Sequence, residues 1–131
     1  MSLPPKPAEI AREVLTIEGE ALLAMREALS ESFDRVIELL LDVRGRVIVS
    51  GMGKSGHIAH KIAATMASTG TPAQMVHPGE ASHGDLGMIT AQDAVILISN
   101  SGETRELADM IAHTRRFSIP LIAITKKTES T

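Results

Sequence analysis

Apolar residues recur every three or four positions through the first forty residues, a spacing that places them on one face of a helix. The first such segment runs from Ala8 to about Leu29, with apolar residues at 10, 14, 17, 21 and 25. A second helix is predicted after Ser30 or Ser32, since either is a suitable N-cap. Its expected buried stripe consists of Phe33, Val36, Ile37, Leu40 and Leu41. We expect both helices to pack on the rest of the chain or on a neighbouring subunit.

From Gly45 onward, short and uniformly apolar runs alternate with helical segments. Strands are predicted at 47–49, 73–77, 95–98 and 121–124, and helices at about 57–68 and 104–117. A strand that is apolar at every position is typical of a parallel sheet covered on both faces. The alternation predicts an α/β domain, a three-layer α-β-α sandwich with a parallel, flavodoxin-like sheet. The two helices would occupy residues 1–44 and the sheet domain residues 45–131. The inward face of the helix at 104–117 is expected to carry Leu107, Ala108, Ile111 and Ala112.

The sequence stops at Thr131, shortly after the apolar run at 121–124. An uncovered apolar strand at the edge of a sheet is prone to pair with other chains. We therefore expect that the C-terminal part of the domain is missing from these 131 residues, or that a partner chain covers this edge.

Composition excludes several classes of partner. The net charge is -3 and aromatic residues make up 2% of the chain, which argues against nucleic-acid binding. The absence of cysteine excludes disulfides and Cys-ligated zinc, and fits a reducing compartment. No signal-peptide pattern opens the chain, and its longest apolar stretch, 36–43, is too short and too charged to span a bilayer. We expect a cytoplasmic protein that binds neither nucleic acid nor membrane.

The first predicted strand leads into the glycine-rich turn GMGKSG, residues 51–56. Its G-x-G-x-x-G spacing is that of dinucleotide-binding turns, but the second strand does not end in the expected acidic residue, and Glu80 lies beyond a Pro-Gly turn. A triphosphate-binding P-loop would need glycine where Ile48 stands. The turn alone fits either close packing of strand against helix or a site where Lys54 meets an anionic or carbonyl group.

The third predicted strand leads into a second turn, SNSGETRE, residues 99–106. Its hydroxyls cluster around Gly102 at the start of a helix, which predicts a phosphate-binding loop. Neighbouring strands one and three would place both turns beside one crevice. The intervening loop, 77–88, carries two histidines that are candidates for contacts with sugar hydroxyls or for proton transfer. No third ligand stands at a fixed spacing, so a required metal is not expected.

Three segments together resemble the sugar isomerase (SIS) domain of bacterial arabinose 5-phosphate isomerases. They are GMGKSGHIAHKIAATMASTGTP, HPGEASHGDLGMI and SNSGETRE. The resemblance runs from about Gly45 to the end, and the N-terminal helices also fit it. It implies the SIS fold, homotetramers, and interconversion of D-ribulose 5-phosphate and D-arabinose 5-phosphate, which feeds 3-deoxy-D-manno-octulosonate synthesis for lipopolysaccharide or capsule. It also implies further catalytic residues and a pair of CBS domains beyond residue 131.

By this resemblance, Lys54 and Glu106 match catalytic positions, and His77 can hold an adventitious divalent ion such as zinc. The expected substrate-binding residues are Ser55, Gly70, Thr71, His77, His83, Ser99, Ser101 and Thr104. Aldose–ketose isomerisation moves a proton between adjacent carbons through an enediol, so it needs a base and an electrophile but no cofactor. Glu106 is the expected base, and Lys54 is expected to stabilise the enediolate oxygen.

A non-catalytic sugar-phosphate sensor is the alternative function. Such a sensor would need the Ser/Thr loop but neither Lys54 nor Glu106.

Overall fold

The computed structural model describes residues 4–129, and the chain divides into two compact units after Arg35. The N-terminal unit is dominated by helix α1 (Pro7–Ala28), which starts with a proline at its first position. The backbone N–H of Lys6 donates to the Glu9 carboxylate at 3.1 Å and caps this start. None of the α1 residues is buried, and large apolar side chains such as Ile10 and Ile17 are about half exposed. Helix α2 (Glu31–Asp42) spans the boundary between the units.

The second unit is built on a parallel sheet. Within residues 36–129 its strands are β1 (Val47–Gly51), β2 (Ala73–Met75), β3 (Ala94–Ile98) and β4 (Leu121–Ile124). They lie in the order β2-β1-β3-β4, which confirms the predicted flavodoxin-like arrangement. Gly51, the last residue of β1, stands opposite Ile98, the last residue of β3. The turns that follow these two strands therefore leave the sheet at the same edge.

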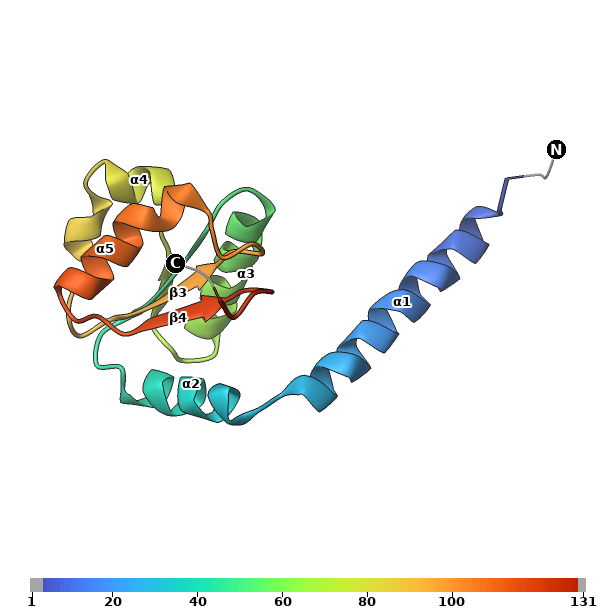
Figure 1. Cartoon of the computed structure of the whole chain (residues 1–131), viewed down its shortest axis with the longest axis horizontal. Helices are drawn as coiled ribbons and strands as arrows, with labels where there is room; N and C mark the ends of the chain where they lie inside the picture. The colour runs from blue at the N-terminus through green and yellow to red at the C-terminus, as the bar shows by residue number, and fades with distance from the viewer. Residues whose placement is uncertain (1–3, 130–131) are drawn as a thin grey trace. The chain divides into compact units, whose positions relative to one another are not determined.

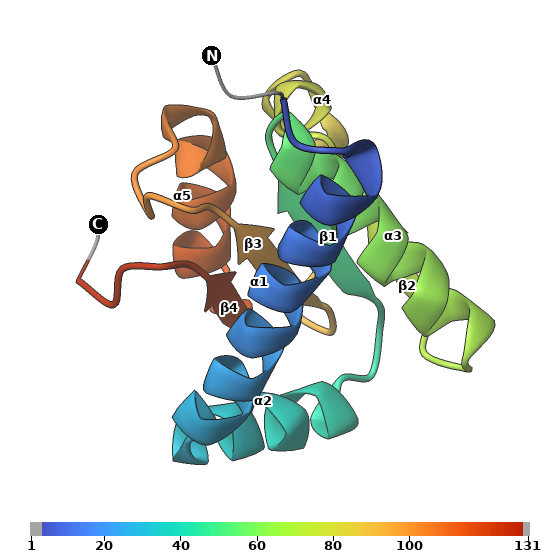
Figure 2. The same cartoon turned by 90° about the vertical axis from the view of Figure 1, so that its right-hand side faces the viewer.

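Successive residues of each strand point to opposite sides of the sheet, so these apolar strands present apolar side chains on both faces. Helices cover both of these faces. On one face, α3 (Lys54–Ser68) and the second half of α2 pack over Val47 and Val49. On the other face, the residues packed around Ile48 and Val95 come from α4 (Pro78–Ser82), the 3-10 turns η1 (Asp85–Met88) and η2 (Arg105–Leu107), and α5 (Ala108–Arg116). Figure 1 and Figure 2 show the sheet between α3 and α5, which confirms the three-layer sandwich.

In two helical segments the inward face matches the prediction only in part. Val36 and Leu40, and likewise Leu107 and Ile111, pack on the core as expected. In α2, the side chains that pack on the core are Val36, Leu39 and Leu40, whereas Leu41 is 80% exposed. In α5, the buried residues are Met110 and Thr114, whereas Ala108 and Ala112 are exposed.

Several segment boundaries also differ from the prediction. Helix α3 begins at Lys54, three residues earlier than expected, and β2 ends at Met75. Residues 77–88, expected as a loop, contain the short helix α4 and the 3-10 turn η1. Within residues 4–129, no helix has both the length and the apolar composition needed to cross a bilayer.

Candidate functional site

The glycine turn after β1 is explained by close packing. Gly53 has a left-handed φ of 57°, which favours glycine at this position. A Cβ atom at residue 56 would lie 2.7 Å from the carbonyl oxygen of Gly51. The first turn of α3 can approach the end of β1 this closely because residue 56 has no side chain. The G-x-G-x-x-G spacing is thus accounted for without a nucleotide. The result is that Lys54, which is exposed, and Ser55 stand in the first turn of α3, at the carboxyl edge of the sheet.

The Ser/Thr loop after β3 is ordered by its own hydroxyls. Ser99 is 8% exposed; its Oγ accepts the N–H of Gly102 at 3.0 Å and lies 2.6 Å from Oγ1 of Thr104. The Ser101 Oγ accepts the N–H of Glu103 at 3.1 Å. These contacts hold three hydroxyl groups in one turn. The Ser99–Thr104 hydrogen bond uses one hydroxyl proton, so the proton of the other member of that pair and the proton of Ser101 can be donated to an anion.

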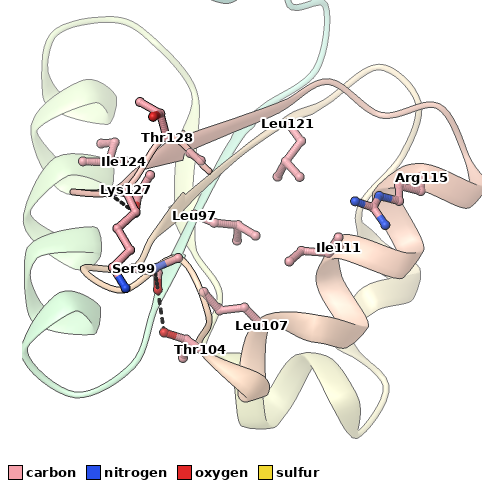
Figure 3. A pocket seen from close by; sticks show the side chains of 13 residues that line it. Leu97, Ser99, Thr104, Leu107, Ile111, Arg115, Leu121, Ile124, Lys127 and Thr128 are labelled. Atoms are coloured by element: carbon pink, nitrogen blue, oxygen red, sulfur yellow. Dashed lines mark hydrogen bonds between the residues drawn. The ribbon is translucent and has the colours of Figure 1, made fainter. Parts of the chain in front are cut away.

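A cavity of about 300 Å³ opens beside this loop (Figure 3). Its apolar wall includes Leu97, Leu107 and Ile111, and the hydroxyls of Ser99 and Thr104 form one end. A separate hollow of about 180 Å³ is lined by Ser55 from α3 and by Asn100, Thr125 and Lys126 among others. The structure therefore brings Ser55 of the glycine turn next to the start of the Ser/Thr loop, as the sequence predicted.

Residues at the end of β4 also border the site, and sequence reasoning missed them. Lys126 donates its backbone N–H to the carbonyl of Asn100 at 3.3 Å, and Lys127 lines the larger cavity together with Ser99 and Thr104. The rule that ligands bind at the carboxyl ends of parallel strands applies to β4 as much as to β1 and β3. It was the signal that would have found these lysines.

The two histidines belong to the helical segment between β2 and β3. His77 is the N-cap of α4, and its Nδ1 accepts the N–H of Gly79 at 3.1 Å. With Nδ1 as acceptor, the neutral ring carries its proton on Nε2 and can donate from there. His83 is the C-cap of α4, next to Ser82, whose hydroxyl donates to Asp109 of α5 at 2.6 Å.

Glu106 lies in η2, at the end of the Ser/Thr loop, and its side chain is exposed. Because β1 and β3 are neighbours, the turns that carry Lys54 and Glu106 leave the sheet at one edge. Gly70 and Thr71 are not brought to this edge. They precede β2, and the carbonyl of the next residue, Pro72, accepts the N–H of Val47 at the start of β1 at 2.9 Å. They therefore lie at the opposite edge of the sheet.

The described residues contain no group of three or more His, Cys, Asp or Glu side chains placed to bind one metal ion. Among residues 4–129, His77 therefore does not have two further such side chains beside it to complete a metal site. A metal at its Nε2 would also require this nitrogen to lose its proton; the neutral ring would then carry the proton on Nδ1, which could no longer accept the N–H of Gly79.

Comparison with known proteins agrees with this fold. Residues 39–131 match the SIS domain, and the chain belongs to the SIS domain family. Arabinose 5-phosphate isomerase KdsD of Yersinia pestis is 54% identical over 123 residues, which are 94% of this chain and 38% of that protein. KdsD of Escherichia coli K12 is 52% identical over 122 residues, 93% of this chain and 37% of that protein.

A solved structure, Escherichia coli CFT073 c3406 in complex with A5P, has a TM-score of 0.82 and 40% identity to this chain. The match covers 97% of this chain and 69% of that one. By contrast, the chain spans well under half the length of the curated KdsD relatives, 37% in the case of E. coli K12.

Proposed function

We propose that this chain forms the sugar-phosphate site of an aldose–ketose isomerase that interconverts D-ribulose 5-phosphate and D-arabinose 5-phosphate. The observation that carries the proposal is the placement of a lysine-bearing helix start and a Ser/Thr loop at one edge of a parallel sheet, with Ser55 and Asn100 lining the same hollow. The KdsD relatives and the A5P-bound structure support the choice of substrate.

The proposed reaction divides into steps that these residues can perform. The hydroxyls of Ser99, Ser101 and Thr104 hold the phosphate and thereby fix the position of the carbon chain. Glu106 removes the proton from C2 of the open-chain aldose, and a proton is delivered to C1. The hydroxyl proton of O2 is transferred to O1. The ketose is an isomer of the aldose, so no oxidant or reductant is consumed. Lys54 stabilises the enediolate oxygen between these transfers.

A sensor of sugar phosphates would use the same phosphate loop. The presence of Lys54 and Glu106 at the same edge favours catalysis, because a ground-state binder gains nothing from a base and an electrophile beside the reacting carbons. We place the reaction in the cytoplasm, as a supply of arabinose 5-phosphate for 3-deoxy-D-manno-octulosonate synthesis.

We also propose that the active protein is a homo-oligomer, a tetramer, whose sites are shared between subunits. Gly70 and Thr71 lie at the sheet edge opposite to Lys54, so contact with substrate requires that they come from a neighbouring copy. The exposed apolar side chains of α1 provide a surface for such a neighbour.

Substitution of Lys54 tests the catalytic assignment. In the intact protein, Lys54→Ala should lower kcat about 10²–10³-fold, the range for removal of one group that stabilises an oxyanion. The dissociation constant for arabinose 5-phosphate should change much less, because the charge acts mainly on the enediolate. Steady-state kinetics and calorimetry on the same variant separate the two quantities. A variant that loses affinity and keeps kcat would assign Lys54 to phosphate binding instead.

A further inference from the structure

The Ser/Thr loop is poor in positive charge for a site that holds a phosphate ester. Residues 99–106 carry two glutamates, Glu103 and Glu106, against one cation, Arg105. Arg105 is exposed and does not line the cavity beside the loop. A phosphate monoester carries a charge of about -1.5 to -2 at pH 7. Hydroxyl and amide donors at a helix start can hold such a group, but they carry no full charge, so a cation beside them would add an ion pair.

The end of β4 is fastened to the loop by two backbone hydrogen bonds. The N–H of Ser99 donates to the carbonyl of Ile124 at 3.0 Å, and the N–H of Lys126 donates to the carbonyl of Asn100 at 3.3 Å. Directly after this anchor, the N–H of Lys127 donates to Oγ1 of Thr125 at 3.3 Å, which turns the chain. The position of Lys127 is thus tied to the position of the hydroxyls.

The two consecutive lysines line different hollows. Lys126 lines the smaller hollow with Ser55 and Asn100, whereas Lys127 lines the cavity that also holds Ser99 and Thr104. Figure 3 shows the Lys127 side chain directed toward Ser99. Arg115, the other cation that lines this cavity, lies at its far end beyond Ile111. Among the residues described, Lys127 is the cation best placed at the loop end of the cavity.

We propose that Lys127 is the phosphate-binding cation of the Ser/Thr loop and pairs with the phosphate that Ser99 and Thr104 hold through their hydroxyls. This inference rests on the proposed function for the identity of the sugar, but not for the presence of a phosphate. The ion pair gives the site its preference for a phosphorylated sugar over a neutral one, because the ammonium group contributes only when the ligand carries the opposite charge.

Calorimetric titration of the full chain tests this role, with inorganic phosphate and D-arabinose 5-phosphate as separate ligands. Lys127→Gln should weaken the binding of both ligands about ten- to hundredfold, the range for a hydrogen bond to a charged group. Lys127→Arg should restore most of the affinity. The salt dependence of phosphate binding should also be shallower in Lys127→Gln than in the wild type, a change that a purely structural role would not cause.

Lys61→Gln is the matched control, since it removes the same charge from an exposed position on α3 that lines neither hollow. Its affinity for phosphate should stay within about threefold of the wild type, as for an exposed charge without a direct contact. Equal losses in the two glutamine variants, or phosphate binding in Lys127→Gln as tight as in the wild type, would overturn the proposal. Circular dichroism and the melting temperature establish that each variant is folded, as expected for an exposed side chain.

The two ligands separate this inference from the proposed function. In one outcome, the wild type binds phosphate but not arabinose 5-phosphate, and Lys127→Gln loses the binding of phosphate. This outcome supports the phosphate-binding role of Lys127 and overturns the proposed substrate. If Lys127→Gln binds and isomerises arabinose 5-phosphate as the wild type does, the phosphate-binding role of Lys127 is overturned and the proposed function is not affected. A wild-type chain that binds neither ligand overturns both.

Discussion

Ser99 and Thr104 form the polar centre of the candidate site. Their hydroxyls lie 2.6 Å apart, and the Ser99 Oγ also accepts the N–H of Gly102, so the loop keeps its shape through side chains rather than through a regular element. A phosphate bound here would be met by hydroxyl groups that are already in place. This preorganisation reduces the entropy that binding must otherwise overcome.

Removing hydroxyls from this loop should weaken phosphate binding specifically. Ser101→Ala with Thr104→Ala removes two donors, and each hydrogen bond to a charged group is worth roughly 1.5–3 kcal/mol. We expect weaker binding of both arabinose 5-phosphate and inorganic phosphate in calorimetry. Ser68→Ala, in the last turn of α3, removes a hydroxyl that bonds only the backbone carbonyl of Ala64 and serves as the control. Unchanged affinity in the double variant would place the phosphate elsewhere.

The hydroxyl cluster was predicted from the sequence, and the two lysines that follow β4 were not. Ser99, Ser101 and Thr104 are close together in the chain, so their proximity needs no knowledge of the fold. Lys126 and Lys127 reach the loop only because β4 pairs with β3, with Ile124 opposite Ile98. The strand order was predicted, but no special residue pattern marked these two lysines as part of the site.

Helix α3 and strand β1 are in contact through glycines. The missing Cβ atoms of Gly51 and Gly56 allow the backbone of α3 to approach the end of β1, and this approach positions Lys54. The sequence pattern predicted a start at about residue 57, and glycine at residue 56 disfavours an earlier one. Tertiary packing overrides that preference and begins the helix three residues earlier.

Alanine at Gly56 should therefore destabilise the fold and displace Lys54. The new Cβ would meet the carbonyl oxygen of Gly51 at 2.7 Å, which requires a backbone shift costing about 1–3 kcal/mol. Gly19→Ala is the control, because nothing lies within 4 Å of that position in α1 and alanine favours helix by roughly 0.5–1 kcal/mol. Chemical denaturation measures both changes. Equal effects of the two substitutions would show that the close approach at Gly56 does not constrain the fold.

The inward faces of α2 and α5 illustrate what periodicity cannot decide. Leu39, Leu40 and Leu41 are consecutive, so the pattern fits more than one helix face, and contact with the sheet selects Leu39 and Leu40. In α5, Thr114 is buried although it is polar, because its Oγ1 donates to the carbonyl of Ile111 at 2.9 Å. Contact with the sheet thus determines the buried face of α2, and an internal hydrogen bond allows Thr114 to be buried in α5.

Two features of the whole chain are not explained by a single copy of it. The α1 helix has no buried residue, and Thr71 lies at the sheet edge away from the Ser/Thr loop. Sites shared between subunits would account for both. The resemblance to a family predicts that Thr71 contacts substrate, and its placement at the edge away from the loop follows from the parallel order of the strands.

Mixed oligomers test shared sites. Thr71→Arg and Lys54→Ala should each abolish most activity alone, the first by introducing a large cation near the substrate. Hetero-oligomers of the two variants should recover part of it, since some sites then combine an intact Lys54 with an intact Thr71. Mass spectrometry confirms the mixing. No recovery in confirmed hetero-oligomers would mean that each subunit forms its site alone.

Exchange of the C2 proton of D-arabinose 5-phosphate with solvent tests isomerase chemistry most directly. The intact protein is incubated with the sugar phosphate in deuterated water, and NMR follows deuterium at C2 and the appearance of D-ribulose 5-phosphate. We predict that both proceed together, because the enediol exposes the transferred proton to solvent, and that Glu106→Gln abolishes both while inorganic phosphate still binds. A protein that binds arabinose 5-phosphate tightly but neither exchanges its C2 proton nor forms the ketose would contradict the proposed function and identify a sensor.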